Sequence, residues 1–447
     1  MGSLPDLDTP SPSLSSRIST VVPATPRGDQ NGAYRLNYMD LLMKLHYIRP
    51  VFLFNSQAVQ GFSISDLKKP MFPLLDLYCH VSGRIRRSES GHPFIKCNDA
   101  GVRIAESHCD RTLQEWVDGN GNGNAVEGLV HDHVLGPDLA FSPLVFVKFT
   151  WFKCGGLSVG LSWAHVLGDA FSAFDFISKW SQMLAGQAPP KSLHMPNLPE
   201  PQILPNSISG NPPISIERTN IVGEYWLATN DKDVATHSFH ITSEQLHYLI
   251  TATSNQYSDT TNKAKKTTYF EIISALLWKC IANIRDQNFG PKAVTICTSK
   301  PNRPENESPT NGFIVLSKIE AEFSIGKCEI SELVKLIDEN KMVENHVVEK
   351  LVEGDEGKED DFIVYGAKLT FVDLEEANTY HGVKLNGHKP IMANCTFHGV
   401  GDQGVVLVLP APEDNELNGG NGRIVTVSLP RDELDQLKDK LGEWGIH

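Results

Sequence analysis

Alternating apolar and polar stretches divide the chain into strand-like and helix-like segments. Residues 157–163 are apolar enough, and the run is short enough, for a buried strand. Residues 144–152 have the same character, and the glycines of 153–156 can turn the two into a hairpin. After Asp169, apolar residues recur at near-helical spacing, so we expect a helix to begin there.

Similar segments are predicted along most of the chain. Asn37 can cap a helix, and Thr268-x-x-Glu271 forms a capping box in front of an apolar stripe. Pro70 and Pro73 should break or bend the helix that opens near Ser65. We expect helices at 38–45, 269–280 and 330–352 and near the C-terminus, and strands at 17–22, 51–54, 294–298, 404–409 and 423–429.

A proline-rich stretch predicts how the domains are organised. The 447 residues are 40% hydrophobic, enough for a large core in two α/β domains. Residues 187–217 carry eight prolines, which is typical of a crossover between domains. We therefore predict a disordered segment at 1–16, an N-terminal domain at 17–186, this crossover, and a C-terminal domain at 218–447.

Charge and cysteine content limit which ligands and which kinds of site the protein is expected to have. The net charge of -14 opposes binding to nucleic acid or to anionic lipid through overall attraction. The eight cysteines include no Cys-x-x-Cys pair, so we expect reduced thiols and no metal site. No apolar run has membrane-spanning length, and the first residues do not resemble a signal peptide. Any membrane association is therefore expected to be peripheral or through a partner.

His165 and Asp169 are the strongest candidates for chemistry. A histidine at the carboxyl end of a strand, just before a helix, is well placed to act as a base on a bound ligand. The same spacing recurs at His398 and Asp402, where no neighbouring residue suggests catalysis. In isolation, the motif therefore more often marks a local contact between the two side chains. With no obvious nucleophile nearby, His165 suits direct transfer, in which it deprotonates an acceptor hydroxyl or amine. Asp169 would then fix the local turn.

Three other sequence patterns bear on possible function. Residues 399–404 match G-x-G-x-x-G, but a strand-like run follows where a dinucleotide site needs a helix, so we predict a tight turn. No Gly-x-Ser-x-Gly elbow is present. Lys263, Lys265 and Lys266 precede a capped helix and could contact phosphates, although such a run more often forms a solvated basic loop.

The chain resembles the BAHD superfamily of acyl-CoA-dependent acyltransferases over residues 17–445. The resemblance rests on His165 and Asp169, on residues 77–85, and on the position of the crossover. It implies a chloramphenicol-acetyltransferase-like fold of two α/β domains with mixed sheets, flanking helices and an inter-domain channel. It also implies acyl-CoA as the donor with no tightly bound cofactor, His165 as general base, and a structural salt bridge from Asp169 to a basic residue near Lys300.

One hallmark of that superfamily is missing. The signature Asp-Phe-Gly-Trp-Gly aligns with residues 384–388, where Lys384 reverses the charge of its aspartate; only Lys389 and Pro390 remain of the Lys-Pro that follows. The Eceriferum-type wax proteins form a branch that also lacks the signature. This chain resembles that branch in longer runs, at 43–49, 132–139, 141–146, 152–156, 222–227 and 398–402.

Two hypotheses follow from the resemblance and stay open. In the first, the protein is a monomeric partner of the condensing enzyme (ketoacyl-CoA synthase) of the fatty-acid elongase, and it promotes synthesis of very-long-chain wax precursors. It would act at the cytosolic face of the endoplasmic reticulum or in the cytoplasm, with the nucleus as a further location, and His165 would be dispensable. In the second, it is an acyl-CoA-dependent O- or N-acyltransferase with His165 as base.

Overall fold

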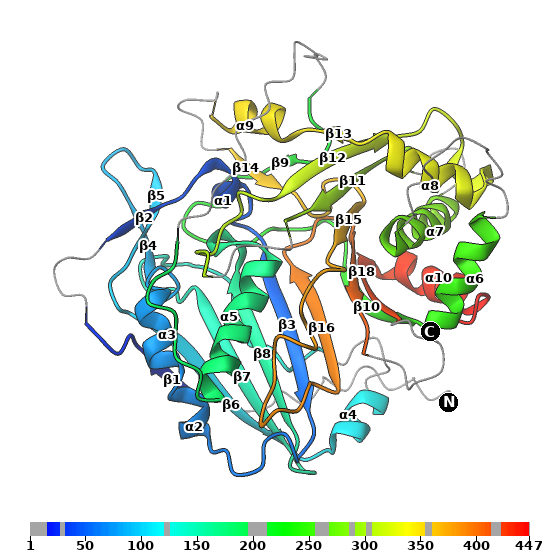
Figure 1. Cartoon of the computed structure of the whole chain (residues 1–447). Helices are drawn as coiled ribbons and strands as arrows, with labels where there is room; N and C mark the ends of the chain where they lie inside the picture. Colours follow the sequence, from blue (N-terminus) through cyan, green and yellow to red (C-terminus); the bar gives the residue numbers. More distant parts are fainter. Residues whose placement is uncertain are drawn as a thin grey trace, which may run out of the picture.

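Two large β-sheets organise the chain, as the computed structural model shows (Figure 1). The structure describes residues 16–26, 32–119, 126–194, 212–254, 268–285, 291–300, 306–353, 360–412 and 422–446. The first sheet contains, in spatial order, β1 (Arg17–Val21), β6 (Val102–Cys109), β7 (Val145–Phe152), β8 (Leu157–Ala164), β3 (Tyr47–Phe54) and β16 (Met392–His398). The second contains β10 (Val234–Ile241), β18 (Arg423–Pro430), β17 (Val405–Pro410), β15 (Thr370–Asp373), β11 (Ala293–Thr298), β12 (Val315–Glu320) and β13 (Met342–Val343).

The predicted hairpin forms the centre of the first sheet. β7 and β8 pair antiparallel, and nearly all of their residues are buried. Continuous apolar strands of this kind are covered on both faces. Helix α5 (Ala170–Leu184) packs on one face, where Phe174 meets Phe52 with ring centroids 6.3 Å apart and Trp180 meets Phe149 at 5.7 Å. Helix α4 (Leu113–Gly119) and residues 126–130 cover the other face.

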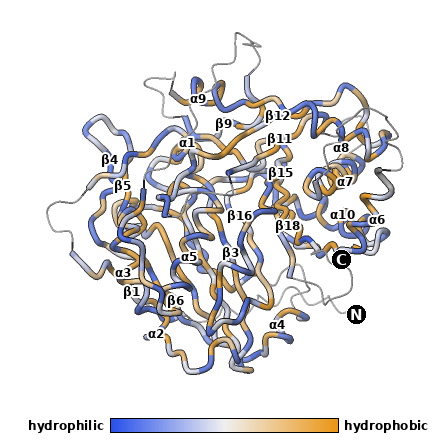
Figure 2. The backbone as a smooth tube through the Cα atoms, in the orientation of Figure 1, coloured by the Kyte–Doolittle hydropathy of each residue, from blue (hydrophilic) through white to orange (hydrophobic). Residues whose placement is uncertain are grey.

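Helices cover the second sheet. Thr268 and Glu271 form the predicted capping box at the start of α7 (Tyr269–Ile284), which is almost wholly buried and drawn mostly in the hydrophobic colour in Figure 2. α6 (Ser243–Ser254), α8 (Ile330–Glu339) and α10 (Arg431–Gly442) pack around it (Figure 1). β15 runs parallel to β11 and β17 and the other pairs are antiparallel, so this sheet is mixed, as is the first.

One strand connects the two halves of the molecule. β16 follows the second-sheet strand β15 along the chain, yet it pairs antiparallel with β3 at the edge of the first sheet. The sequence-based boundary at residue 218 places these residues in the C-terminal domain, so it misses the exchange. Asn394 of β16 ties the sheets together, because its amide donates to Ser238 Oγ at 2.8 Å and accepts from Thr426 Oγ1 at 2.8 Å.

Short elements complete the description. Two small sheets contain β2 (Ala33–Arg35), β5 (Pro93–Lys96) and β4 (Arg84–Arg87), and β9 (Glu217–Thr219) with β14 (Asp361–Ile363). The helix near Ser65 is broken at Pro70, as predicted, into α2 (Ile64–Lys68) and α3 (Met71–Leu77).

Three predicted elements differ in extent. α1 (Tyr38–Leu42) is capped by Asn37 but ends earlier than expected. β3 continues through Pro50, whose missing N–H is tolerated because no β8 partner is paired with it. The helix predicted at 330–352 is two helices, α8 and α9 (Asn345–Glu353), separated by β13, because Met342 and Val343 pair with β12 instead of continuing the helix. Glu344, just before α9, accepts from the Ile214 and Ser215 amides.

Candidate active site around His165

His165 and Asp169 lie at the junction between β8 and α5. β8 ends at Ala164, and residues His165–Leu167 form a short 3-10 turn. Asp169 is then the N-cap of α5, and its Oδ1 accepts from the backbone amide of Ser172 at 3.0 Å and from the Ser172 hydroxyl at 2.9 Å. Its carboxylate therefore caps the first turn of the helix.

Hydrogen bonds determine the tautomer of His165, whose side chain is fully buried. The Asn311 Nδ2 donates to the His165 carbonyl at 2.8 Å, so the Asn311 Oδ1 must be the atom that faces His165 Nδ1, 3.1 Å away. Nδ1 therefore carries the proton, and Nε2 presents its lone pair. That lone pair is 3.0 Å from the hydroxyl of Tyr365, which donates to it.

The pKa values of these groups are shifted because water is excluded. Burial lowers the pKa of His165 to about 4, so the ring is neutral at pH 7 and a weak base. Burial also raises the pKa of Tyr365 well above its usual value, so its hydroxyl remains a donor. Burial raises the pKa of Asp40 to about 6, against hydrogen bonds that lower it, including one of 3.0 Å from Asn311 Nδ2.

The ring of Tyr365 fills the space beside His165. It lies edge-on to His46 with ring centroids 4.8 Å apart and against Phe397 at 4.7 Å. The Sγ atom of Cys297 is 4.0 Å from its hydroxyl. Two surface cavities, of about 600 Å³ beside Pro430 and about 400 Å³ between α6, α7 and α8, are lined by none of these residues. His165 has none of its surface exposed, so it is enclosed by the chain itself.

A hydroxyl beside Lys300, near which the resemblance places the basic partner of Asp169, also bonds to this carboxylate. Ser299 Oγ donates to Asp169 Oδ2. The ammonium group of Lys300, the next residue, lies 5.1 Å from the centre of the Phe313 ring. These contacts still hold the second domain, which supplies Ser299, against the start of α5.

The segment in place of the missing signature is a tight turn that supports α5. Leu385 and His388 close the turn, and Asn386 and Gly387 both have positive φ, as a two-residue turn of this kind requires. The backbone amide of Lys384 donates to Ser181 Oγ at 2.8 Å, and Ser181 Oγ donates to the Lys384 carbonyl at 2.7 Å. The substituted segment therefore keeps a packing role against the helix that Asp169 caps.

Several runs that resemble the Eceriferum branch meet beside this site. The Tyr47 hydroxyl donates to the Trp226 carbonyl and accepts from the Leu135 amide, both at 2.8 Å, and the Trp226 amide donates to the Leu135 carbonyl. Arg49 forms an ion pair with Asp132 at 2.7 Å. Runs 43–49, 132–139 and 222–227 thus build one cluster of contacts, next to His46.

Other expected features lie elsewhere or outside the described residues. Lys263, Lys265 and Lys266 fall in a part of the chain that the structure does not describe. Residues 399–404 form the predicted turn between β16 and β17. Among the described residues, no group of His, Cys, Asp and Glu could hold a metal ion, and no helix is long and apolar enough to cross a membrane.

Comparison with known proteins establishes the family. The Transferase family model matches residues 15–443. The chain belongs to this family of BAHD acyltransferases. Within it, the chain is similar to Protein ECERIFERUM 2 of Arabidopsis thaliana, with 39% identity over 96% of this chain and 98% of the relative. Protein ECERIFERUM 26-like of the same plant is 35% identical over 96% of this chain and 95% of its own length.

Solved structures of BAHD acyltransferases share the fold. Vinorine synthase superposes with a TM-score of 0.64 at 15% identity, covering 95% of this chain and 96% of its own. An F. graminearum protein complexed with coenzyme A and deoxynivalenol gives a TM-score of 0.67 at 13% identity, covering 91% and 97%. The two-domain BAHD fold is therefore confirmed, and so is the Eceriferum branch.

The sequence did not reveal the partners of His165. Asn311 and Tyr365 are 146 and 200 residues away from it in the chain, and no spacing rule connects them. The only available signal is a weak one for His46, which lies in the branch-like run 43–49.

Proposed function

We propose that the protein promotes the elongation of very-long-chain fatty acids for cuticular wax, acting with the condensing enzyme of the elongase at the cytosolic face of the endoplasmic reticulum. The similarity to the ECERIFERUM proteins over nearly the whole chain supports this role. The observation that carries it is the state of His165. Both ring nitrogens bond to the protein and the side chain is fully buried, so no lone pair is left for an acceptor alcohol.

A second function, acyl transfer from acyl-CoA to a hydroxyl or amine, is favoured by one observation. Asn311 holds His165 in the tautomer whose Nε2 can take a proton, which is the tautomer that a general base needs. For transfer to occur, the acceptor would have to displace the Tyr365 hydroxyl from Nε2. Family membership supports this alternative, and the lost signature at 384–388 counts against it.

Expression in yeast with a plant wax-elongase condensing enzyme separates the two functions. Fatty-acid chain lengths would be profiled with the wild type, with His165→Ala, with His398→Ala as a matched control, and with the condensing enzyme alone. Protein amounts would be equalised by immunoblot. We expect all three forms to lengthen the products equally. Lengthening by the wild type and His398→Ala alone would favour acyl transfer, and no lengthening by any form would reject the elongation role.

Physical association provides an independent test. We expect the protein to co-purify with the condensing enzyme from detergent-solubilised membranes, and its absence from such preparations would count against the partnership. Purified protein incubated with radioactive acyl-CoA and candidate alcohols should give no product. An ester that forms with the wild type and disappears with His165→Ala would instead support the transferase.

A further inference from the structure

The hydrogen bond between His165 and Tyr365 has the geometry of a general base bound to the hydroxyl of an acyl acceptor. A general base in hydroxyl acylation accepts a hydrogen bond from the alcohol that it will deprotonate, at about 2.6–3.2 Å. The Tyr365 hydroxyl donates to Nε2 of His165 at 3.0 Å, and the proton on Nδ1 leaves Nε2 as the acceptor. The chain thus places a phenol of its own where an external hydroxyl would bind.

The backbone around Tyr365 holds this hydroxyl in position. His46 Nε2 accepts from the Val364 amide at 3.1 Å, and the Tyr365 carbonyl accepts from the Gly401 amide at 2.8 Å. Gly366 has a φ of +89°, and a Cβ added there would lie 2.4 Å from the Gly401 oxygen. The backbones of the Tyr365 segment and of the 399–404 turn are therefore in contact, with no room for a side chain at Gly366.

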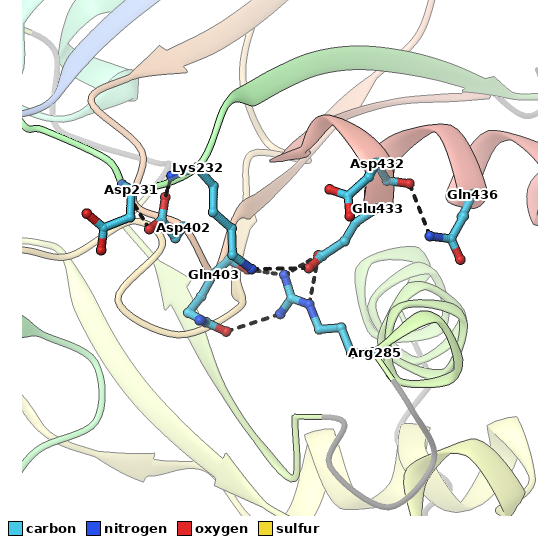
Figure 3. A network of polar contacts seen from close by, with 8 residues as sticks. All are labelled: Asp231, Lys232, Arg285, Asp402, Gln403, Asp432, Glu433 and Gln436. Atoms are coloured by element: carbon cyan, nitrogen blue, oxygen red, sulfur yellow. Dashed lines mark hydrogen bonds and ion pairs between the residues drawn. The ribbon is translucent and has the colours of Figure 1, made fainter.

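A polar network anchors the 399–404 turn in its place (Figure 3). Asp402 accepts from the backbone amides of Asp231 and Lys232, each at 3.2 Å. Arg285, the C-cap of α7, donates to the Gln403 carbonyl at 3.0 Å and pairs with Glu433 of α10 at 2.7 Å. The support of Tyr365 thus extends to two helices of the second domain, which makes Tyr365 a fixed part of the site.

We propose that Tyr365 occupies a latent acceptor site of this protein, a ring-sized, apolar-walled pocket that would take a phenolic hydroxyl and aim it at Nε2 of His165. His46, Phe397 and Cys297 form the walls, and the base is already in the correct tautomer. Removing the Tyr365 side chain should open this pocket to a small phenol. The inference concerns residues of this chain and stands whether or not the protein promotes elongation.

Binding of p-cresol, the analogue of the tyrosine side chain, to purified Tyr365→Ala tests the proposal. Toluene has the same shape without the hydroxyl, and an apolar cavity prefers it because burying an unbonded hydroxyl is costly. We expect calorimetry to show p-cresol binding about tenfold more tightly than toluene to Tyr365→Ala. In Tyr365→Ala/His165→Phe the preference should reverse. A preference for toluene in the single variant, or one that is unchanged by His165→Phe, would overturn the proposal.

Two further measurements make the result specific. Tyr380→Ala opens a cavity at another buried tyrosine, whose hydroxyl bonds to the backbone of Ala393. The preference of that cavity between p-cresol and toluene should not respond to His165→Phe.

If Tyr365→Ala fails to fold, a double-mutant cycle of Tyr365→Phe and His165→Phe replaces the binding measurement. We expect coupling of about fivefold in the unfolding equilibrium constant. No coupling would overturn the proposal. The chain-length assay in yeast does not depend on either result.

Discussion

The motif His-x-x-x-Asp occurs twice in this chain, and the two copies have different structural roles. At His165 the motif joins a strand to a helix, and Asp169 caps that helix. At His398 it joins two strands through a glycine turn, and Asp402 accepts from the exposed amides of Asp231 and Lys232. The spacing is identical, so the element that follows decides the role of each aspartate.

The two copies nevertheless meet at one residue. The first provides the imidazole that accepts from the Tyr365 hydroxyl, and the second provides the turn that holds the Tyr365 backbone. A weak motif thus becomes informative only when its tertiary neighbours are known. Substitutions can show whether the copies are coupled in this way.

The largest effect on stability should come from separating the backbone at Gly366 from the backbone of the 399–404 turn. In Gly366→Val the new Cβ would collide with Gly401 at a φ of +89°, so we expect a loss of about 3 kcal/mol in the free energy of unfolding. Gly387 has a similar φ but open space around it, and Gly387→Val should cost only about 1 kcal/mol. Denaturant unfolding measures both, and equal losses would mean that the contact between the segments is unimportant.

The next largest effect should come from Asn311. Asn311→Ala removes the partner of His165 Nδ1 and of the His165 carbonyl, so we expect a loss of about 2 kcal/mol. Asn394→Ala removes a buried amide of similar connectivity and is the matched control. Nitrogen NMR of labelled histidine should show His165 losing its Nδ1–H tautomer only in Asn311→Ala. An unchanged tautomer would contradict the assignment.

Both histidines should make stability depend on pH. Burial lowers the pKa of His165 and of His398 to about 4, whereas each takes up a proton near pH 6.5 when unfolded. The unfolded state therefore binds more protons between these values, and stability falls as the pH falls from 6.5 towards 4. His165→Gln and His398→Gln should each reduce that loss by about 2 kcal/mol at pH 4.5. Unfolding curves at pH 7 and 4.5 measure it, and a loss equal to that of the wild type would be the contrary result.

The smallest effects should distinguish the aspartates. Asp169→Ala removes a helix cap and leaves the buried Ser172 hydroxyl with one bond fewer, so we expect a loss of about 1.5 kcal/mol. Asp402→Ala exposes two amides to water and should cost about 0.5 kcal/mol. Thermal unfolding of the two variants side by side provides the measurement. An Asp402→Ala variant that is the less stable of the two would reverse the comparison.

The sequence by itself determined the local elements and the family. The hairpin of β7 and β8, the Asp169 junction and the Thr268 capping box follow from apolar periodicity and from caps, which act over a few residues. Residues 399–404 were predictable as a turn because a strand pattern follows them. The split between α8 and α9 was not, because it depends on the pairing of Met342 and Val343 with β12, a tertiary contact that the helical pattern does not signal.

Only the tertiary structure decided the state of the site. It brings Asn311, Tyr365 and His46 from three distant segments to one imidazole, and it takes β16 from the second half of the chain into the first sheet. Those contacts depend on which faces pack together, and a single sequence carries no periodic signal for that choice. Whether a histidine at the end of a strand faces a ligand or its own protein is therefore settled by packing.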